Sequence, residues 1–156
     1  SLFDDRGAYG SWSAKHAAPT KWSFLPGLPF CHPACMFRRE AFLEVGGYRV
    51  APETRRGQDY DMFMRLYAAG FRGLNLSDVL YSYRVDQDTL ARRRFRYRVD
   101  ESVIRLKGFR SMGLLPLGLP FVFKPYAAHL VQLARSSVYR SQLRNIGGPR
   151  GNGSLR

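Results

Sequence analysis

Side chains that could do chemistry are concentrated between residues 31 and 86. Cys31, His32 and Cys35 lie close together in a Cys-His-Pro-Ala-Cys segment and offer three potential metal ligands. Their spacing differs from that of paired zinc-binding cysteines, and no fourth ligand follows nearby. We therefore interpret the two cysteines as buried free thiols of a protein from a reducing compartment.

Asp59 is the main candidate for acid–base chemistry. It follows Gln58 at the expected start of a helix, where a carboxylate can accept hydrogen bonds from unpaired backbone N–H groups. Helix physics alone thus favours a structural role, and catalysis by a rigidly held base is compatible with it. Asp61 lies about 200° further round the helix. We expect it to form an exposed pair with Arg65, worth about half a kcal/mol.

Hydrophobic periodicity predicts short strands and helices, hence an α/β fold. Residues 1–28 show no sustained period and are expected to be irregular. The expected regular segments are strands at 35–37, 71–76 and 79–85 and helices at 39–45, 58–69, 89–108 and 126–144. Gly46-Gly47 and Gly70 should end the first two helices, because glycine readily adopts the left-handed conformation.

Charge is distributed unevenly along the 156 residues, whose net charge is +13. Residues 92–156 carry 14 Lys/Arg against 2 Asp/Glu, whereas residues 1–91 carry 11 against 10. Such a field favours phospholipid headgroups, a diphosphate-linked substrate or nucleic acid. Prolines and Lys124 interrupt the most apolar segment, so no run of about 18 apolar residues predicts a membrane span.

Three blocks between residues 32 and 86 together resemble the second half of family 2 glycosyltransferases. They are His-Pro-Ala-Cys-Met-Phe-Arg-Arg-Glu-Ala-Phe-Leu-Glu-Val-Gly-Gly-Tyr-Arg from His32, Gly-Gln-Asp-Tyr-Asp-Met-Phe-Met-Arg-Leu from Gly57, and Tyr-Arg-Val-Asp from Tyr83. The resemblance implies a partial GT-A, Rossmann-like domain at 1–88 that lacks the N-terminal nucleotide-binding half. A basic, amphipathic helical extension at 89–146 and a disordered tail at 147–156 would follow. We expect the chain, which starts without methionine, to be a piece of a longer protein.

The resemblance also implies a reaction and its base. An acceptor hydroxyl displaces a nucleotide diphosphate from a sugar with inversion, and Asp59 matches the aspartate that accepts the hydroxyl proton. Gln58 stands where the family usually has glutamate and is expected to contact substrate. His32 is expected to touch the acceptor or donor sugar, or else to be held by backbone bonds. Arg38 is expected to contact the diphosphate or to be a solvated residue at a helix start.

Two further residues are placed near the donor by the same resemblance. Arg84 is expected to bind phosphate oxygens in a bidentate manner. Asp86 replaces the usual histidine and is either a ligand for Mg²⁺ or Mn²⁺ or a simple loop carboxylate. The divalent cation and the nucleotide-sugar donor are expected to bind mainly through the missing half, so the fragment alone should be inactive.

The basic second part has three interpretations. Arg92–Arg98 interleaves cations with aromatic rings, which fits a helix on anionic lipid, a nucleic-acid-binding arm or a solvated face. The resemblance favours a saccharide or lipid-linked acceptor, a role in cell-surface polysaccharide or glycolipid synthesis, and a cytoplasmic, peripheral position at the inner membrane face, with no nucleic acid bound. The alternatives are a basic nucleic-acid-binding module or a noncatalytic remnant of a truncated transferase.

Overall fold

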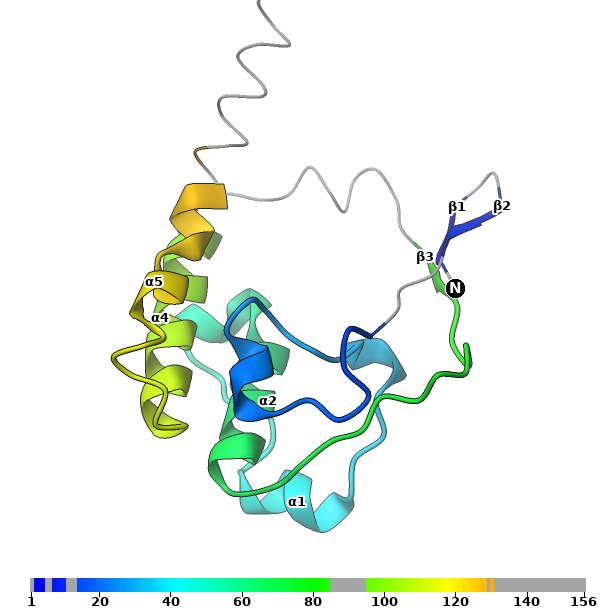
Figure 1. Ribbon diagram of the computed structural model, residues 1–156, viewed down its shortest axis with the longest axis horizontal. Coiled ribbons are helices and arrows are strands. Elements are labelled where there is room, and N and C mark those ends of the chain that lie inside the picture. Colours follow the sequence, from blue (N-terminus) through cyan, green and yellow to red (C-terminus); the bar gives the residue numbers. More distant parts are fainter. Residues whose placement is uncertain (1, 5–6, 11–13, 85–94, 129, 131–156) are drawn as a thin grey trace, which may run out of the picture.

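The computed structural model describes residues 2–4, 7–10, 14–84, 95–128 and 130. Helices dominate these residues, and the few strands are short (Figure 1). In chain order the elements, with 3₁₀ helices marked η, are β1 (Leu2–Asp4), β2 (Gly7–Gly10), η1 (Lys21–Phe24), η2 (His32–Ala34), α1 (Arg39–Glu44), η3 (Pro52–Arg56), α2 (Gln58–Ala68), β3 (Tyr83–Arg84), α4 (Phe95–Ser111) and α5 (Leu119–Val122). The chain is helical again from 124 to 128.

The first two predicted helices are confirmed, and glycines end both. Gly46 and Gly47 follow α1 with φ angles of +73° and +62°. The Gly47 N–H donates to the Phe42 carbonyl at 2.9 Å, which closes the helix end. Gly70 follows α2 with a φ of +96°. These signals are local in sequence, which is why periodicity and glycine position predicted them.

The hydrophobic core surrounds α2. Six apolar or aromatic residues of α2 are buried, namely Tyr60, Met62, Phe63, Met64, Leu66 and Tyr67. Phe24, from the segment expected to be irregular, and Phe30, just after it, pack against this helix and supply core aromatics. Burial raises the pKa of Tyr60, whose hydroxyl donates to the Phe24 carbonyl. The buried aromatic rings thus fix the N-terminal segment on α2.

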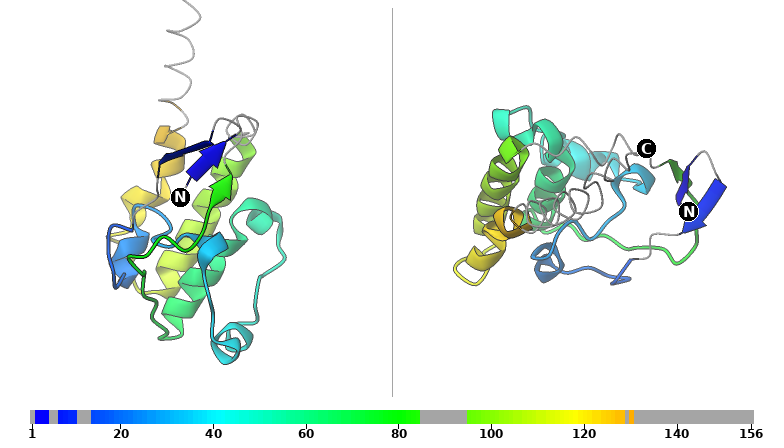
Figure 2. Two further views of the ribbon diagram at one scale, coloured as in Figure 1. Left: turned by 90° about the vertical axis from the view of Figure 1, so that its right-hand side faces the viewer. Right: turned by 90° about the horizontal axis from the view of Figure 1, so that it is seen from above.

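The basic helix α4 packs directly against α2 and η3 (Figure 2). Its Ile104 and Phe109 belong to the same core cluster as Met64 of α2. Two glycines allow the close approach. A Cβ on Gly108 would lie 2.3 Å from the Met64 sulfur, and one on Gly57 would lie 2.6 Å from the Ile104 side chain. The described part of the predicted 89–146 extension therefore shares its core with the preceding residues, while 89–94, 131–146 and the predicted tail lie outside the described residues.

The strand predictions were mostly wrong. Residues 35–37 and 71–76 form no strand, and within the described residues 79–84 the strand assigned is Tyr83–Arg84, which pairs in parallel with β1. β1 also pairs antiparallel with β2, within the segment predicted to be irregular. The reason is physical, because a strand needs a neighbouring backbone to satisfy its N–H and C=O groups, and periodicity does not reveal whether one is present. Leu74 and Leu80 are accordingly 74% and 78% exposed.

Asp61 joins α2 to the loop that follows α1. It pairs with Arg65 at 2.8 Å, as predicted. The prediction that this pair is exposed was wrong, because Asp61 is only 6% exposed and also binds Arg49 at 2.8 Å. Arg65 in turn donates to the carbonyls of Val45 and Gly47. A buried carboxylate shared by two arginines contributes more than a surface pair.

We expect Asp61→Asn to destabilise the protein by about 2 to 3 kcal/mol, because it removes charge from bonds to two arginines. Urea unfolding measures the loss. The control is Asp78→Asn, an exposed carboxylate whose substitution should change stability by less than about 0.5 kcal/mol. Equal stabilities of the two variants would show that the two arginine bonds contribute nothing beyond a surface pair.

Candidate functional site

Asp59 lies in the first turn of α2 and is half-buried. Its Oδ1 accepts the Tyr60 backbone N–H at 2.8 Å, so the structural role expected of a helix-start carboxylate is present. Among the described residues its Oδ2 has no hydrogen-bond or ion-pair partner. One oxygen thus fixes the side chain, and the other is available to a ligand.

A cavity of about 500 Å³ lies beside Asp59, between α2, α4 and residues 124–128. Apolar and aromatic residues form part of its wall, and charged residues form the rest. The lining residues are Pro26, Gly27, Leu28, Glu53, Arg56, Gly57, Asp59, Tyr60, Tyr97, Arg98, Asp100, Glu101, Ile104, Arg105, Lys124, Pro125 and Ala128. The volume lies within the range of small-ligand sites.

Arg105 holds the walls of this cavity together. Although cationic, it is only 3% exposed. Its guanidinium binds Glu101 at 2.9 Å, donates to the Leu25 carbonyl at 2.9 Å and lies 5.2 Å from the centre of the Tyr60 ring. One buried cation therefore connects α4, the residue after η1, and α2, and its charge is compensated inside the protein.

His32, expected to touch a sugar or to be held by backbone bonds, is bonded to a side chain that the sequence did not single out. His32 Nε2 and the Tyr48 hydroxyl are 2.6 Å apart, and their rings meet edge to face. Burial, then the charge of Asp59 and then Cys35, raise the pKa of Tyr48, which places Tyr48 within electrostatic reach of Asp59. His32 and Tyr48 thus form a hydrogen-bonded pair. The signal in the sequence was an aromatic residue directly after the Gly46-Gly47 stop.

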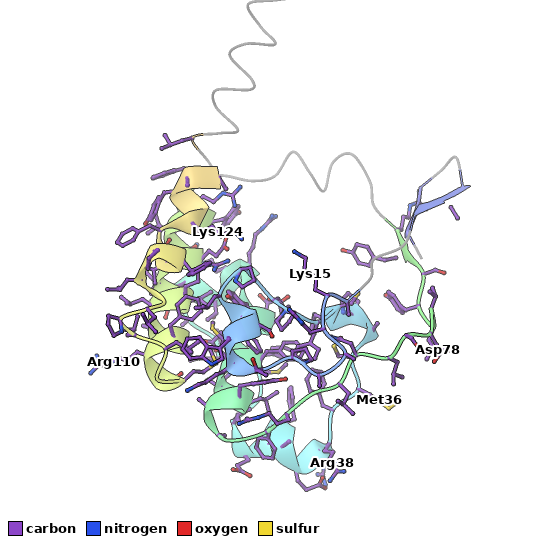
Figure 3. The ribbon with its side chains drawn as sticks, in the orientation of Figure 1. Lys15, Met36, Arg38, Asp78, Arg110 and Lys124 are labelled. Atoms are coloured by element: carbon purple, nitrogen blue, oxygen red, sulfur yellow. The ribbon has the colours of Figure 1, made fainter. Side chains whose placement is uncertain are left out.

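The other predicted substrate residues do not line the cavity. Gln58 opens α2 with an exposed side chain, and Arg38 precedes α1, also exposed. Figure 3 shows Arg38 at the lower edge of the molecule, well apart from the cavity-lining Lys124. Arg84 belongs to β3, which lies at the opposite end from α4 and α5 (Figure 1). Asp86 lies outside the described residues, so its predicted metal role stays a prediction.

The structure offers little for a metal ion in the residues it describes. Among them, no three His, Cys, Asp or Glu side chains come together in a way that could hold one. Cys31 and Cys35 are free and half-buried. Burial and then the neighbouring Cys31 raise the pKa of the Cys35 thiol to about 11, and this thiol donates to the Cys31 carbonyl at 3.3 Å. The described residues therefore do not fit a divalent cation on their own.

Two lining residues were missed although the sequence contained a signal for them. Asp100 and Glu101 are the two acidic residues among the 14 cations of residues 92–156, and both face the cavity wall. A pair of adjacent acids inside a basic segment indicates internal pairing or a ligand.

No helix in the described parts of the chain is both long and apolar enough to span a membrane.

Comparison with known proteins relates the chain to a glycosyltransferase. It is 34% identical over 124 residues to a Bacillus subtilis (strain 168) protein named "Putative glycosyltransferase EpsE". The match includes 80% of this chain and spans 44% of the length of that relative. No protein-family model and no solved structure matches. The similarity supports glycosyl transfer in general as the class of activity.

Glu53, on the cavity wall, makes the stability of the fold depend on pH. Hydrogen bonds from Lys107 at 2.6 Å, from backbone and from Arg49 at 2.9 Å lower the pKa of this carboxyl from 4.5 to about 2. Since the folded state binds this proton more weakly than the unfolded chain, the stabilisation is complete above about pH 4.5 and is lost as the pH falls toward 2.

We expect the urea concentration at the unfolding midpoint to decrease as the pH is lowered from 4.5 to 2. Glu53→Gln should make that decrease smaller. Urea titrations at several pH values in this window measure it. Glu44→Gln, an exposed acid of α1, serves as the control and should leave the profile of the parent protein unchanged. A Glu53→Gln profile with the parent's slope would contradict the assignment.

Proposed function

We propose that the chain is the acceptor-side half of an inverting family 2 glycosyltransferase of GT-A fold, with Asp59 as its general base. The observation that carries the proposal is the position of Asp59, on a helix terminus at the wall of a cavity, with one oxygen fixed and the other unpaired. The similarity to a glycosyltransferase supports the class of reaction.

In the proposed reaction the acceptor hydroxyl attacks the anomeric carbon of a nucleotide-bound sugar. The bond from the acceptor oxygen to that carbon forms as the bond to the diphosphate oxygen breaks on the opposite face, which inverts the configuration. Asp59 takes the hydroxyl proton, and the nucleotide diphosphate leaves with the electron pair. A rigid base of this kind contributes about a hundred- to ten-thousand-fold in rate. Because the bond from the Tyr60 N–H holds the carboxylate, little reorganisation is needed.

The donor side of the reaction is assigned to the rest of a longer protein. The relative is more than twice as long as the stretch that matches, since that stretch spans 44% of it. A nucleotide-sugar donor and a Mg²⁺ or Mn²⁺ ion on its diphosphate would bind there, with Arg84 and Asp86 as further candidates. We propose cell-surface polysaccharide or glycolipid synthesis as the context.

The alternative of a nucleic-acid-binding module is less well supported by the arrangement of cations. Arg98 and Arg105 pair with Glu101, Lys107 pairs with Glu53, and Arg56 lies over the Tyr97 ring. Such cations are compensated within the protein and contribute less to binding phosphates than the sequence implies. A noncatalytic remnant remains the competing proposal, and the activity of the complete protein separates the two.

In the full-length protein, we expect Asp59→Asn to lower the rate of sugar transfer by about a hundred- to ten-thousand-fold while donor affinity is kept, because only proton removal is lost. Nucleotide release from a panel of nucleotide sugars, with membrane glycolipids as acceptors, measures the rate. Asp78→Asn, whose carboxylate Figure 3 places away from α4 and the cavity, should behave as the parent. A folded Asp59→Asn protein with activity within a few-fold of the parent would exclude Asp59 as the base.

We propose that anionic lipid binds the exposed side of residues 110–124, with the protein peripheral at the inner face of the cytoplasmic membrane. Leu117, in the turn between α4 and α5, is 69% exposed, and Phe123, directly after α5, is 61% exposed. The exposed cations Arg110, near the end of α4, and Lys124, after α5, lie at the two ends of this stretch (Figure 3). Apolar side chains beside cations suit a lipid interface with anionic headgroups. Phe121, by contrast, packs partly against the core and is unsuited to test the surface.

We expect the double variant Leu117→Ser and Phe123→Ser to weaken binding to phosphatidylglycerol vesicles by about tenfold or more, because two apolar groups no longer insert. Vesicle flotation at low and high salt measures it. The matched control, Met36→Ser with Val50→Ser, changes two apolar residues that are 98% and 100% exposed elsewhere and should bind as the parent does. Tight binding to RNA without vesicle binding would contradict the lipid proposal.

A further inference from the structure

The 3₁₀ helix η1 lies beside the stretch that leads from the end of α4 to α5. Lys21 Nζ donates to the Met112 carbonyl at 3.3 Å, and Lys124 Nζ donates to the Pro26 carbonyl at 2.6 Å. In the view from above in Figure 2, η1 (blue) and the turn after α4 (yellow) lie on the same side of α2. Two segments that are far apart in the sequence therefore lie side by side at the surface.

Trp22 of η1 belongs to the exposed side of these segments. It is 47% exposed, whereas Phe24 of the same helix is fully buried in the core. Lys21 Nζ lies 5.6 Å from the centre of the Trp22 ring and is itself bonded to Met112, directly after α4, which places the ring near the end of that helix. An exposed indole combines a large apolar area with an N–H donor, as side chains at the boundary between lipid and water do.

Neither of the two segments contains an acidic residue. Residues 14–39 and 102–130 include no Asp or Glu, and both ranges contain cations. Arg110 and Lys124 are exposed, and within the described parts of the chain neither forms an ion pair. The surface made by η1 and residues 110–124 therefore attracts anions.

The apolar side chains of this surface favour lipid as its anionic partner. Leu119, at the start of α5, is 41% exposed, and Leu117 is more exposed still. Such aliphatic side chains have no ring on which a nucleic-acid base could stack. Lipid matches both features of the surface, since its headgroups bind the cations and its interface takes up apolar groups.

We infer that η1 is a second membrane contact, in which the Trp22 ring inserts among anionic headgroups that Arg110 and Lys124 bind. The inference rests on the lipid binding proposed above for residues 110–124. It extends that surface to the N-terminal part of the chain, which the sequence did not connect with lipid. Pro26 and Lys124 also line the cavity beside Asp59, so this membrane contact lies next to the wall of the site.

Fluorescence quenching by brominated lipid tests the inference directly. Phosphatidylglycerol that is brominated on its acyl chains quenches an indole that enters the bilayer and leaves an indole in water unquenched. The 156 residues contain two tryptophans, Trp12 and Trp22, which allows a matched pair of variants. We expect these vesicles to quench the parent and Trp12→Phe, and we expect Trp22→Phe to lose most of that quenching. Vesicles of brominated phosphatidylcholine, which have no net charge, should neither bind nor quench.

Flotation with phosphatidylglycerol vesicles measures how much the ring contributes to binding. Trp22→Ser should weaken binding by about tenfold, because a large apolar group no longer inserts. The matched control is Leu43→Ser, since Leu43 is 59% exposed in α1, between Glu40 and Glu44, and should be indifferent to lipid. Urea unfolding of both variants should match that of the parent, because Trp22 and Leu43 lie outside the core cluster.

The outcomes separate this inference from the proposal on which it rests. Vesicle binding that needs Leu117 and Phe123, with Trp22 unquenched and Trp22→Ser binding as the parent does, would overturn only the role of η1. Binding that needs Trp22 and is indifferent to the Leu117→Ser and Phe123→Ser pair would keep η1 and refute the contact through residues 110–124. No binding to phosphatidylglycerol at low salt would overturn both. None of these measurements depends on Asp59, so the general base is tested separately.

Discussion

The buried carboxylate of Asp61 is the constraint from which the geometry of the site follows. It binds Arg49 and Arg65, each at 2.8 Å, and Arg65 also reaches the carbonyl of Gly47 at 2.6 Å. Tyr48 lies between Gly47 and Arg49 in the chain, so its backbone is held beside α2, while its side chain is 41% exposed and bonds to His32. Asp59 is on the same helix as Asp61. One buried charge thereby connects the loop after α1 to the helix that carries Asp59.

The basic helix α4 is a wall of the site as well as a source of charge. In the sequence its cations suggested a surface for phosphates or lipid. In the structure Arg105 is buried among Glu101, carbonyls and the Tyr60 ring, and Arg98 is partly neutralised by Glu101 at 3.7 Å. A formal charge of +13 thus overstates the field that a ligand near the cavity would experience. The unpaired cations lie elsewhere, for instance at Arg38 and Arg110, which the structure leaves exposed.

The sequence predicted those features that depend on residues close together in the chain. The helices at Arg39–Glu44 and Gln58–Ala68 and their glycine stops were predicted, because capping and periodicity act over a few residues. The strands failed because pairing is non-local, as the parallel pairing of Leu2 with Tyr83 illustrates. Asp59 was proposed as a base from its motif, but the cavity beside it arises where α4 crosses α2. No pattern near residue 59 contains that information, and the burial of Asp61 was missed for the same reason.

Two glycines, Gly57 and Gly108, allow α4 to lie close to α2 because neither has a Cβ. Gly108 faces the Met64 sulfur and Gly57 faces Ile104, at distances where a Cβ could not be accommodated without movement. Of the two, Gly57 lines the cavity and Gly108 does not. A larger residue at Gly108 would require either the Met64 side chain or α4 to shift, and a shift of α4 would change the width of the cavity without altering a residue on its wall. Related proteins with the same cavity-lining residues can therefore differ in the ligand that fits, because the spacing of the two helices sets the width of the cavity.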